Sequence, residues 1–141
     1  MENCIFCWIV RKDSRASEVY SDETVLAFMD IQPVNPDHVL VIPRRHYSSL
    51  AELDEEAGAR LFKVAMRVAG GLRRSGLKCE GVNFHLADGE VAGQEVLHVH
   101  LHVIPMFRGD GFGIRFGPHS RLRPGKKELD KVALDIRKGM S

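Results

Sequence analysis

Three histidines alternate with aliphatic residues along the segment His98-Val99-His100-Leu101-His102-Val103. Strict alternation is typical of a β-strand, in which successive side chains point to opposite faces. One face would carry three imidazoles at steps of about 6.6 Å, and the other face would carry the three aliphatic side chains. The pattern predicts a strand over His98–Ile104 that ends at Pro105, with one face on a core and the other available for chemistry.

Three other segments have the length and composition of strands or hairpins. Glu18–Tyr20 and Thr24–Asp30 flank a short polar turn, which predicts a hairpin. The apolar run within His38–Pro43 fits a central strand that is buried on both faces. Gly81–Leu86 predicts a further strand, so the chain offers enough strands for one sheet.

An apolar stripe at spacings of three and four residues predicts one long amphipathic helix. Its members are Leu53, Ala57, Leu61, Val64, Ala65, Val68 and Leu72. Asp54 is a suitable N-cap and Gly76 a suitable end. The glycine- and proline-containing residues 109–125 are expected to be irregular, and a second helix is expected within Lys126–Lys138. This order of elements predicts an α+β domain, an antiparallel sheet with its helices on one face.

The composition excludes several classes of protein. The chain has 141 residues, 44% of them hydrophobic and 28% charged, as expected for one soluble globular domain over residues 1–141. Its net charge of +1 gives no overall basic character that would point to nucleic acid. The N-terminal apolar stretch is too short to span a membrane and has no preceding basic region, so neither a membrane anchor nor a secretory signal is expected.

The charge is unevenly distributed along the chain. Residues 1–107 carry 11 basic and 15 acidic side chains, a net charge of −4, whereas residues 108–141 carry 9 and 4, a net charge of +5. Such a basic extension either guides a polyanionic substrate or forms an ordinary solvated helix face. Both interpretations stay open from the sequence alone.

The three cysteines do not suit a closed disulfide framework. Cys4 and Cys7 form a C-x-x-C pair, and Cys79 stands alone as a small, partly buried apolar residue. In a reducing cytoplasm, where this protein is expected, the pair indicates half of a metal site or a redox motif.

The alternating histidines allow two functional interpretations besides burial in a core. Imidazoles with ordinary pKa values near 6.5 suit a zinc site, or a site in which one ring attacks phosphorus while its neighbours polarise the target. The upstream loop contains Gly89, Gly93 and Gln94. Glycine N–H groups and a side-chain amide can bind phosphate oxygens, which favours the phosphorus-directed site.

His98–Val103, preceded by Gly93-Gln94, resembles the signature of the histidine triad (HIT) family. The segment Asp30-Ile31-Gln32-Pro33, followed by His38–Pro43 and His46, resembles the first half of the family's sequence. The similarity covers residues 3–107, and the start Cys4-Ile5-Phe6-Cys7 resembles the zinc-containing bacterial branch.

The resemblance implies a HIT-like fold of about five antiparallel strands, one long helix and a C-terminal helix. Residues 1–107 would form the core with the nucleotide site, and residues 108–141 would form a basic extension with a helix. HIT proteins are nucleotide hydrolases or transferases that cleave at the α-phosphorus. The resemblance therefore implies a homodimeric hydrolase of purine nucleoside phosphoramidates or dinucleoside polyphosphates, which releases a nucleoside monophosphate such as AMP and needs no organic cofactor.

The resemblance also assigns roles to individual residues. The middle histidine, His100, would be the nucleophile; His102 and Gln94 would contact the α-phosphate, and His38 would line the site. For nucleotide binding, Asp30 would hold the ribose, and the remaining contacts would come from Ile31, Phe6, Ile9 and Gly93 in addition to Gln94, His100 and His102. Ordinary core packing is the alternative role for Phe6, Ile9 and Ile31.

The zinc-containing branch further implies a structural zinc ion, one per chain. Its ligands would be Cys4, Cys7, His46 and His98, two thiolates and two imidazoles. A C-x-x-C that binds no metal is the alternative, and a third interpretation places a catalytic zinc on the three alternating histidines themselves.

The sequence departs from the family pattern at two places. Ala87 and Asp88 stand where many relatives have an Asn near the phosphate, so Asn83 is a substitute to consider. Glu95 follows Gln94, where the phosphoramidate-cleaving branch often has Ser. Ala87 supports a rival function, a nucleotide-binding or scaffold protein whose turnover is vestigial.

Overall fold

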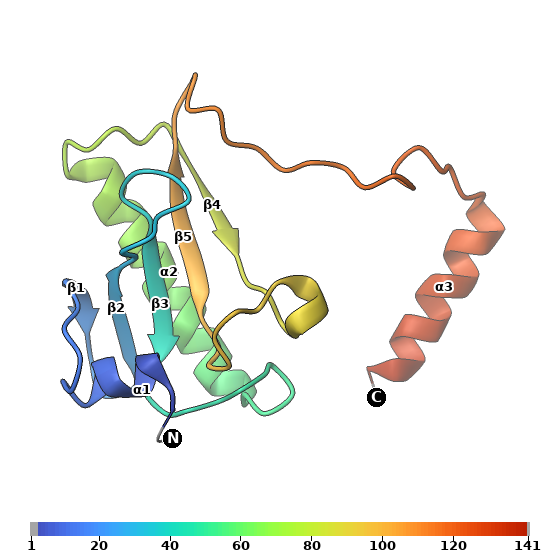
Figure 1. The fold of residues 1–141 in the computed structure, drawn as a ribbon. Helices are drawn as coiled ribbons and strands as arrows, with labels where there is room; N and C mark the ends of the chain where they lie inside the picture. Colours follow the sequence, from blue (N-terminus) through green and yellow to red (C-terminus); the bar gives the residue numbers. More distant parts are fainter. Residues whose placement is uncertain (1–2, 141) are drawn as a thin grey trace.

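The computed structural model describes residues 3–140, and within them five strands form one antiparallel sheet (Figure 1). The strands are β1 (Glu18–Ser21), β2 (Val25–Met29), β3 (Val39–Pro43), β4 (Gly81–His85) and β5 (Leu101–Met106), in the sheet order β1-β2-β3-β5-β4. The helices are α1 (Ile5–Val10), α2 (Glu55–Arg74) and α3 (Lys126–Gly139), with a 3-10 turn η1 at Glu90–Ala92. The predicted α+β class, with a long helix and a C-terminal helix, is confirmed.

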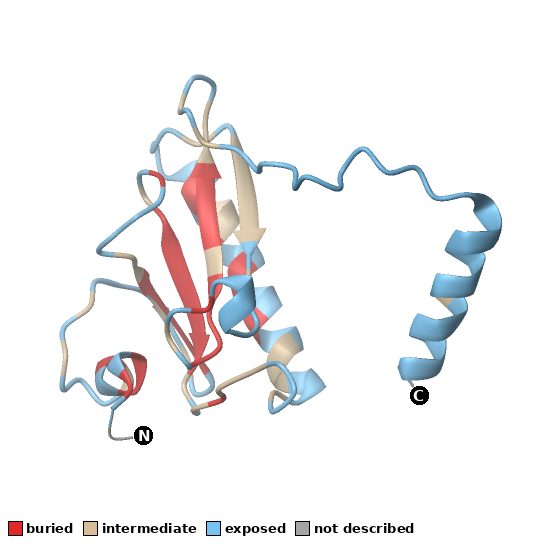
Figure 2. Cartoon of the chain, turned by 45° about the vertical axis from the view of Figure 1, so that its right-hand side comes forward, coloured by how far each residue is buried: buried red, intermediate tan, exposed pale blue. Residues whose placement is uncertain are grey.

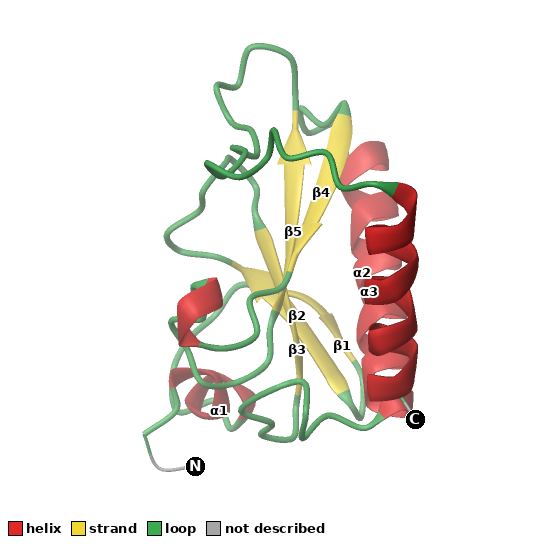
Figure 3. Ribbon diagram, turned by 90° about the vertical axis from the view of Figure 1, so that its right-hand side faces the viewer, coloured by secondary structure: helices red, strands yellow, loops and turns green. Residues whose placement is uncertain are grey.

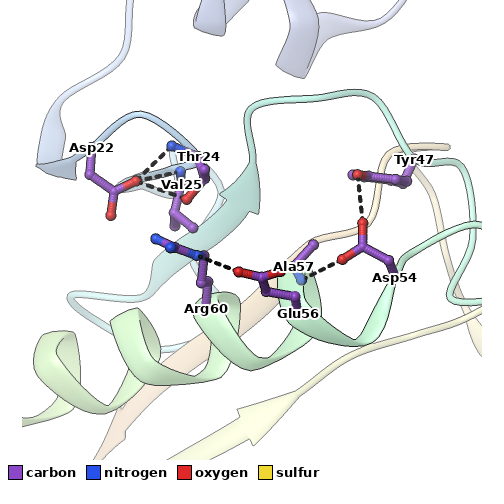
Figure 4. Close-up of polar contacts among 8 residues, drawn as sticks. All are labelled: Asp22, Thr24, Val25, Tyr47, Asp54, Glu56, Ala57 and Arg60. Atoms are coloured by element: carbon purple, nitrogen blue, oxygen red, sulfur yellow. Dashed lines mark hydrogen bonds and ion pairs between the residues drawn. The ribbon is translucent and has the colours of Figure 1, made fainter.

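The long helix α2 covers one face of the sheet, because its apolar stripe shares a core with inward-facing strand residues such as Val41 and Val103. It begins at the predicted N-cap. The carboxylate of Asp54 accepts a hydrogen bond from the Ala57 N–H at 2.8 Å and another from the Tyr47 hydroxyl at 3.2 Å (Figure 4). These bonds fix the start of α2 against the segment that follows β3.

The alternation in the histidine segment is confirmed, but its strand lies further along the chain than predicted. Val99, Leu101 and Val103 all pack in the core beneath α2. The hydrogen-bonded strand β5 starts only at Leu101, and it continues through Pro105 to Met106.

Pro105 does not end the strand, because the N–H that proline lacks would have no partner in the sheet at this position. The N–H and C=O of one strand residue point to the same side, and the Pro105 carbonyl accepts from Nδ2 of the buried Asn35 at 2.9 Å. That side of β5 faces the loop before β3, where the β3 ladder is absent; on the other side Pro105 pairs with Val82 of β4.

A second, smaller core lies on the opposite face of the sheet (Figure 3). There α1 packs through Phe6 and Ile9 on β2 and β3, and the Phe6 and Phe28 rings meet edge to face at 5.6 Å. This short helix was not predicted, and its position corrects the expectation that all helices lie on one face.

Residues 108–125, the arm, leave the end of β5 and carry α3 away from the sheet (Figures 1 and 2). The base of the arm is held by the carboxylate of Asp110, which accepts from the N–H of Phe107 at 2.8 Å, the N–H of Phe112 at 3.0 Å and Nδ2 of Asn35 at 3.1 Å. From residue 113 to residue 140 every side chain except that of Ala133 is exposed. No helix in the described residues is long and apolar enough to cross a membrane.

Candidate functional site

A cavity of about 710 Å³ opens on the face of the sheet that carries α1. Of the residues predicted to catalyse or to bind nucleotide, all but Gln94 line it: Phe6, Ile9, Asp30, Ile31, His38, Gly93, His100 and His102. Its volume is in the range of sites that enclose a small organic molecule. Residues that are far apart in the sequence thus meet around one space.

A hydrogen bond to the His98 carbonyl fixes which ring nitrogen of His100 carries the proton. Nδ1 lies 2.7 Å from the carbonyl oxygen of His98, which can only accept, so Nδ1–H donates. Burial lowers the pKa of His100 below its ordinary value of 6.5, which favours the neutral ring. A neutral ring protonated at Nδ1 has its lone pair on Nε2, so His100 provides a nucleophilic nitrogen in a residue that lines the cavity.

Two linked hydrogen bonds place the proton of His102 on the other ring nitrogen, Nε2. The backbone N–H of Val34 donates to Nδ1 of His38 at 3.2 Å, so the proton of neutral His38 is on Nε2. That Nε2–H donates to Nδ1 of His102 at 2.8 Å. His102 must then carry its own proton on Nε2, which makes this N–H a donor for a bound ligand.

Electrostatics support this assignment of protons. Burial lowers the pKa of His38, and burial followed by the neighbouring His100 and His38 lowers the pKa of His102 to about 4. Both rings are therefore neutral near pH 7. The carboxylate of Asp30 lies 3.5 Å from Nδ1 of His38, and its negative charge raises the pKa of that ring, but the effect of burial is larger.

Four side chains predicted as metal ligands form a separate cluster behind the cavity. The ligand atoms of Cys4, Cys7, His46 and His98 all lie within 4.8 Å of one another. The S···N distances are 3.3 Å from Cys7 to His46, 3.5 Å from Cys4 to His98 and 3.7 Å from Cys7 to His98. Zn–S bonds of about 2.3 Å and Zn–N bonds of about 2.0–2.1 Å at tetrahedral angles require S···N separations of about 3.6 Å. The donor set therefore fits zinc in both chemistry and spacing.

The orientation of His98 also suits a ligand. Its Nε2 lies 2.8 Å from the carbonyl oxygen of Pro43, so Nε2–H donates and the lone pair of Nδ1 faces the two sulfur atoms. Burial lowers the pKa of His98 to about 4, so the ring is neutral, as metal binding requires. Cys4 and Cys7 are brought together because Cys4 is the N-cap of α1 and its sulfur accepts from the Cys7 N–H.

The three alternating histidines thus divide between two sites. Among the described residues, the groups able to hold a metal are Cys4/Cys7/His46/His98 and Asp30/His38/His102, and neither contains all three alternating histidines. In the second group, His38 and His102 are joined by a direct hydrogen bond. A single catalytic zinc on the three alternating histidines is therefore not what this geometry favours.

The comparisons with known proteins agree with this arrangement. Residues 11–109 match the family model of the HIT domain. The chain belongs to the HIT family. A solved structure of a Streptococcus mutans protein is 38% identical and superposes with a TM-score of 0.91, covering 100% of this chain and 87% of that one.

Two further solved HIT structures bear on the metal cluster and on the class of reaction. A zinc-bound histidine triad family protein of Mycobacterium smegmatis is 35% identical, with a TM-score of 0.77 over 99% of each chain. A HIT family hydrolase of Legionella pneumophila is 30% identical, with a TM-score of 0.65 over 82% of this chain and 99% of that one. The recognised family, its fold and a zinc-type donor set are therefore supported together.

Gln94 is the predicted site residue that the structure does not bring into the cavity. Its side-chain oxygen accepts from the Gly89 N–H at 2.8 Å, and its nitrogen donates to the carbonyls of Ser48 and Val96 at 2.9 and 3.0 Å. The buried amide braces the loop that contains Gly93, a residue with a left-handed backbone (φ 97°). Gly93 itself does line the cavity.

The structure also shows where the residues that depart from the family pattern lie relative to the cavity. Asp88 does not line the cavity, and its carboxylate accepts from the Leu50 N–H at 3.0 Å. Ala87 is buried, whereas Asn83 and Glu95 both line the cavity. Asn83 is thus available as the amide that Ala87 does not supply, and Glu95 adds a negative charge near His100.

Sequence reasoning missed His85, which lies opposite His102 in the β4–β5 register and lines the cavity. The two rings are 5.5 Å apart, centroid to centroid. The available signal was alternation on β4, because Asn83 and His85 must share a face of that strand. Phe112 and Ile114 of the arm also line the cavity, and no pattern in their glycine-rich segment predicted this.

Proposed function

We propose that this protein is a nucleotide hydrolase that cleaves at the α-phosphorus of purine nucleoside phosphoramidates or dinucleoside polyphosphates and releases a nucleoside monophosphate such as AMP. The observation that carries the proposal is the fixed tautomer of His100, a neutral imidazole with its Nε2 lone pair available. Membership of the HIT family and the likeness to a HIT family hydrolase support the same class of reaction.

The chemistry proceeds in two displacements. In the first, Nε2 of His100 attacks the α-phosphorus; an N–P bond forms, and the bond to the leaving group breaks with its electron pair. The Nε2–H of His102 donates to a non-bridging oxygen, where negative charge develops. In the second, water attacks phosphorus, the N–P bond breaks and the monophosphate leaves. Over both steps one water supplies the hydroxyl of the monophosphate and the proton of the leaving group.

The rest of the cavity fits a nucleoside. Asp30 lies beside the histidines, and one of its oxygens already accepts from the Gln32 N–H at 2.8 Å, which holds the carboxylate in place for the ribose hydroxyls. Phe6, Ile9 and Ile31 provide apolar walls for a purine base. Phe6 and Ile9 also belong to the core beneath α1, whereas Ile31 is 91% exposed, which leaves its side chain free to cover a ligand.

A structural zinc ion, one per chain, is part of the proposal. Cys4, Cys7, His46 and His98 would hold it, and a set of four protein ligands leaves no position for substrate. His98 links this site to the nucleophile, because its ring faces the cluster while its carbonyl accepts from His100. The metal would thereby stiffen the backbone that orients His100.

We further propose a homodimer in the cytoplasm, with no nucleic acid or membrane partner. The outer strand β4 has one neighbour, β5, within the described sheet, so its other edge is available to pair with a second copy. The three free cysteines suit a reducing compartment.

A binding or scaffold protein with vestigial turnover is the rival function. One observation favours it: the Gln94 amide is bonded to three backbone groups and does not line the cavity. A binding protein would hold AMP and release none from a substrate, so turnover separates the two functions.

The test follows the release of AMP from adenosine 5′-phosphoramidate and from a diadenosine polyphosphate. Wild type is compared with His100→Ala and with His119→Ala, which removes an exposed histidine of the arm. Release by wild type and His119→Ala, with loss of at least about 10³-fold in His100→Ala, is the expected result. Rapid quenching in base should also trap a nucleotidyl group on His100.

Two outcomes would overturn the hydrolase proposal. Negligible release by all three proteins, despite measurable AMP binding, would favour the binding protein. Activity that survives in His100→Ala but disappears with zinc removal would move the chemistry to a metal site. Metal analysis of His100→Ala makes the distinction, because zinc should be retained in that variant.

A further inference from the structure

The C-terminal helix α3 has an apolar face that nothing in the described chain covers. Leu129, Val132, Ala133 and Ile136 recur at spacings of three and four residues and so lie on one side of the helix. Ile136 is 59% exposed and Leu129 is 52% exposed. Helices of about 12–15 residues are marginal in water when isolated, and α3 has 14 residues, so this face requires a surface to pack on.

The position of the arm and α3 is nevertheless defined. Asp110 and Asn35 fix the direction in which the arm leaves the sheet. The Streptococcus mutans structure covers the whole chain with a TM-score of 0.91. Residues 108–141 make up about a quarter of the chain, so a superposition that missed them could not score much above three quarters. The arm therefore has a similar position in that protein, although almost every side chain from residue 113 to residue 140 is exposed in this chain.

A matching apolar groove lies at the other edge of the sheet. It measures about 350 Å³ between α2 and the β1–β2 hairpin, and its lining residues are Val19, Tyr20, Met29, Val39, Arg67, Val68, Gly71, Leu72, Ser75 and Leu77. A Cβ atom added at Gly71 would meet no atom within 4 Å, so there is open space above this point of α2. Glycine weakens a helix interior, but it lets another helix approach closely.

The groove cannot be filled by the α3 of the same chain in this arrangement. The groove lies toward β1, and α3 lies beyond β4, at the opposite edge of the sheet (Figure 1). Arg67 is the one charged residue of the groove lining. Glu128 and Asp135 border one side of the apolar face of α3, and Lys126 and Arg137 border the other, so the acidic side can lie next to Arg67.

We propose that α3 of one copy packs in the groove between α2 and the β1–β2 hairpin of a second copy, so that two chains exchange their arms. A two-fold arrangement satisfies both helices and both grooves at once and closes the assembly at two chains. The proposal concerns the C-terminal arm and does not depend on the catalytic reaction.

Mixed disulfide formation tests the contact directly. In a Cys79→Ser background, with zinc supplied to the cysteine cluster, Gly71→Cys is co-refolded with an equal amount of Leu129→Cys, Val132→Cys or Ile136→Cys and mildly oxidised. At least one mixture should give a linked pair of chains, up to about half of the protein, because about half of randomly paired dimers are mixed. The matched control is Gly70→Cys, which should give none, because Gly70 does not line the groove and a Cβ there would face the guanidinium of Arg74.

Three outcomes would refute the exchange. They are no linked pair in any Gly71→Cys mixture, equal linking with Gly70→Cys, and an internal disulfide within single chains of the Gly71→Cys/Val132→Cys double variant. The last would place the arm on its own domain.

A second comparison does not depend on disulfides. Gly71→Leu should fill the groove while strengthening α2. Gly70→Leu gives the helix the same benefit outside the groove, where it displaces only the flexible end of the Arg74 side chain. Only Gly71→Leu should make the arm at least about tenfold more sensitive to trypsin, which can cleave after Arg115 and Arg121. Equal sensitivity in the two variants would contradict the proposal.

Discussion

His102 should make the stability of this protein fall steeply in mild acid. The ring is partly buried beside His38 and His100, and its pKa is lowered from 6.5 to about 4. In the folded state the ring resists protonation, whereas in the unfolded chain it protonates near pH 6.5. Acid therefore favours the unfolded state, and stability that is complete above about pH 6.5 is lost as the pH falls toward 4.

The size of the effect follows from the difference between the two pKa values. A shift of about 2.5 units corresponds to about 3 kcal/mol at full titration, at 1.36 kcal/mol per unit. Between pH 7 and pH 4.5, most of this, about 2 kcal/mol, should be lost. Domains are stable by about 5–15 kcal/mol, so one histidine should remove a measurable fraction.

Urea unfolding at pH 7 and at pH 4.5 measures this loss, in wild type and in His102→Gln at equal zinc concentration. The substitution removes the titrating ring, so the variant should lose about 2 kcal/mol less than wild type between the two pH values. Loss of zinc in acid affects both proteins alike and cancels in the difference. The control His119→Gln removes an exposed imidazole and should match wild type. If wild type and His102→Gln lose equal stability, the ring does not resist protonation and the tautomer chain through His38 is wrong.

Three shorter predictions test other parts of the structure. Cys4→Ser should abolish zinc binding and lower the thermal midpoint, measured by metal analysis and calorimetry, whereas Cys79→Ser should keep the zinc. Asn35→Ala should cost about 1–3 kcal/mol in urea unfolding, because it leaves the carbonyl of Pro105 without its donor; an unchanged midpoint would contradict this. Gly93→Ala should destabilise the protein by about 1 kcal/mol or more, because its φ of 97° is unfavourable for a residue with a Cβ.

Sequence patterns predicted the elements that are defined by the spacing of apolar residues within one segment. The stripe on α2 and the alternation around Leu101 each define an apolar face, and both faces pack in one core as expected. The Asp54 cap was predictable for the same reason, since the carboxylate bonds to an N–H three residues away.

Features that depend on distant partners were not predictable in this way. The strand continues past Pro105 because the side-chain amide of Asn35, seventy positions earlier, donates a hydrogen bond to the Pro105 carbonyl. Gln94 points away from the cavity because its amide is hydrogen-bonded to three backbone groups, those of Gly89, Ser48 and Val96. Alternation on β4 places His85 on the same face as Asn83, but only the β4–β5 register brings His85 opposite His102.

The cysteine–histidine cluster and the cavity are linked through one residue, His98. The ring of His98 faces the sulfur atoms of Cys4 and Cys7, and its carbonyl fixes the proton of His100. A change at the proposed zinc ligands should therefore affect His100, the proposed nucleophile, through the backbone of His98. If the proposed hydrolase function is correct, substitution of a cluster residue should slow turnover, because the carbonyl that orients Nδ1–H of His100 becomes less fixed, while every proposed substrate contact is kept. Loss of the ring of His100, by contrast, should leave the cluster intact, so the two defects are separable by comparing metal content with turnover.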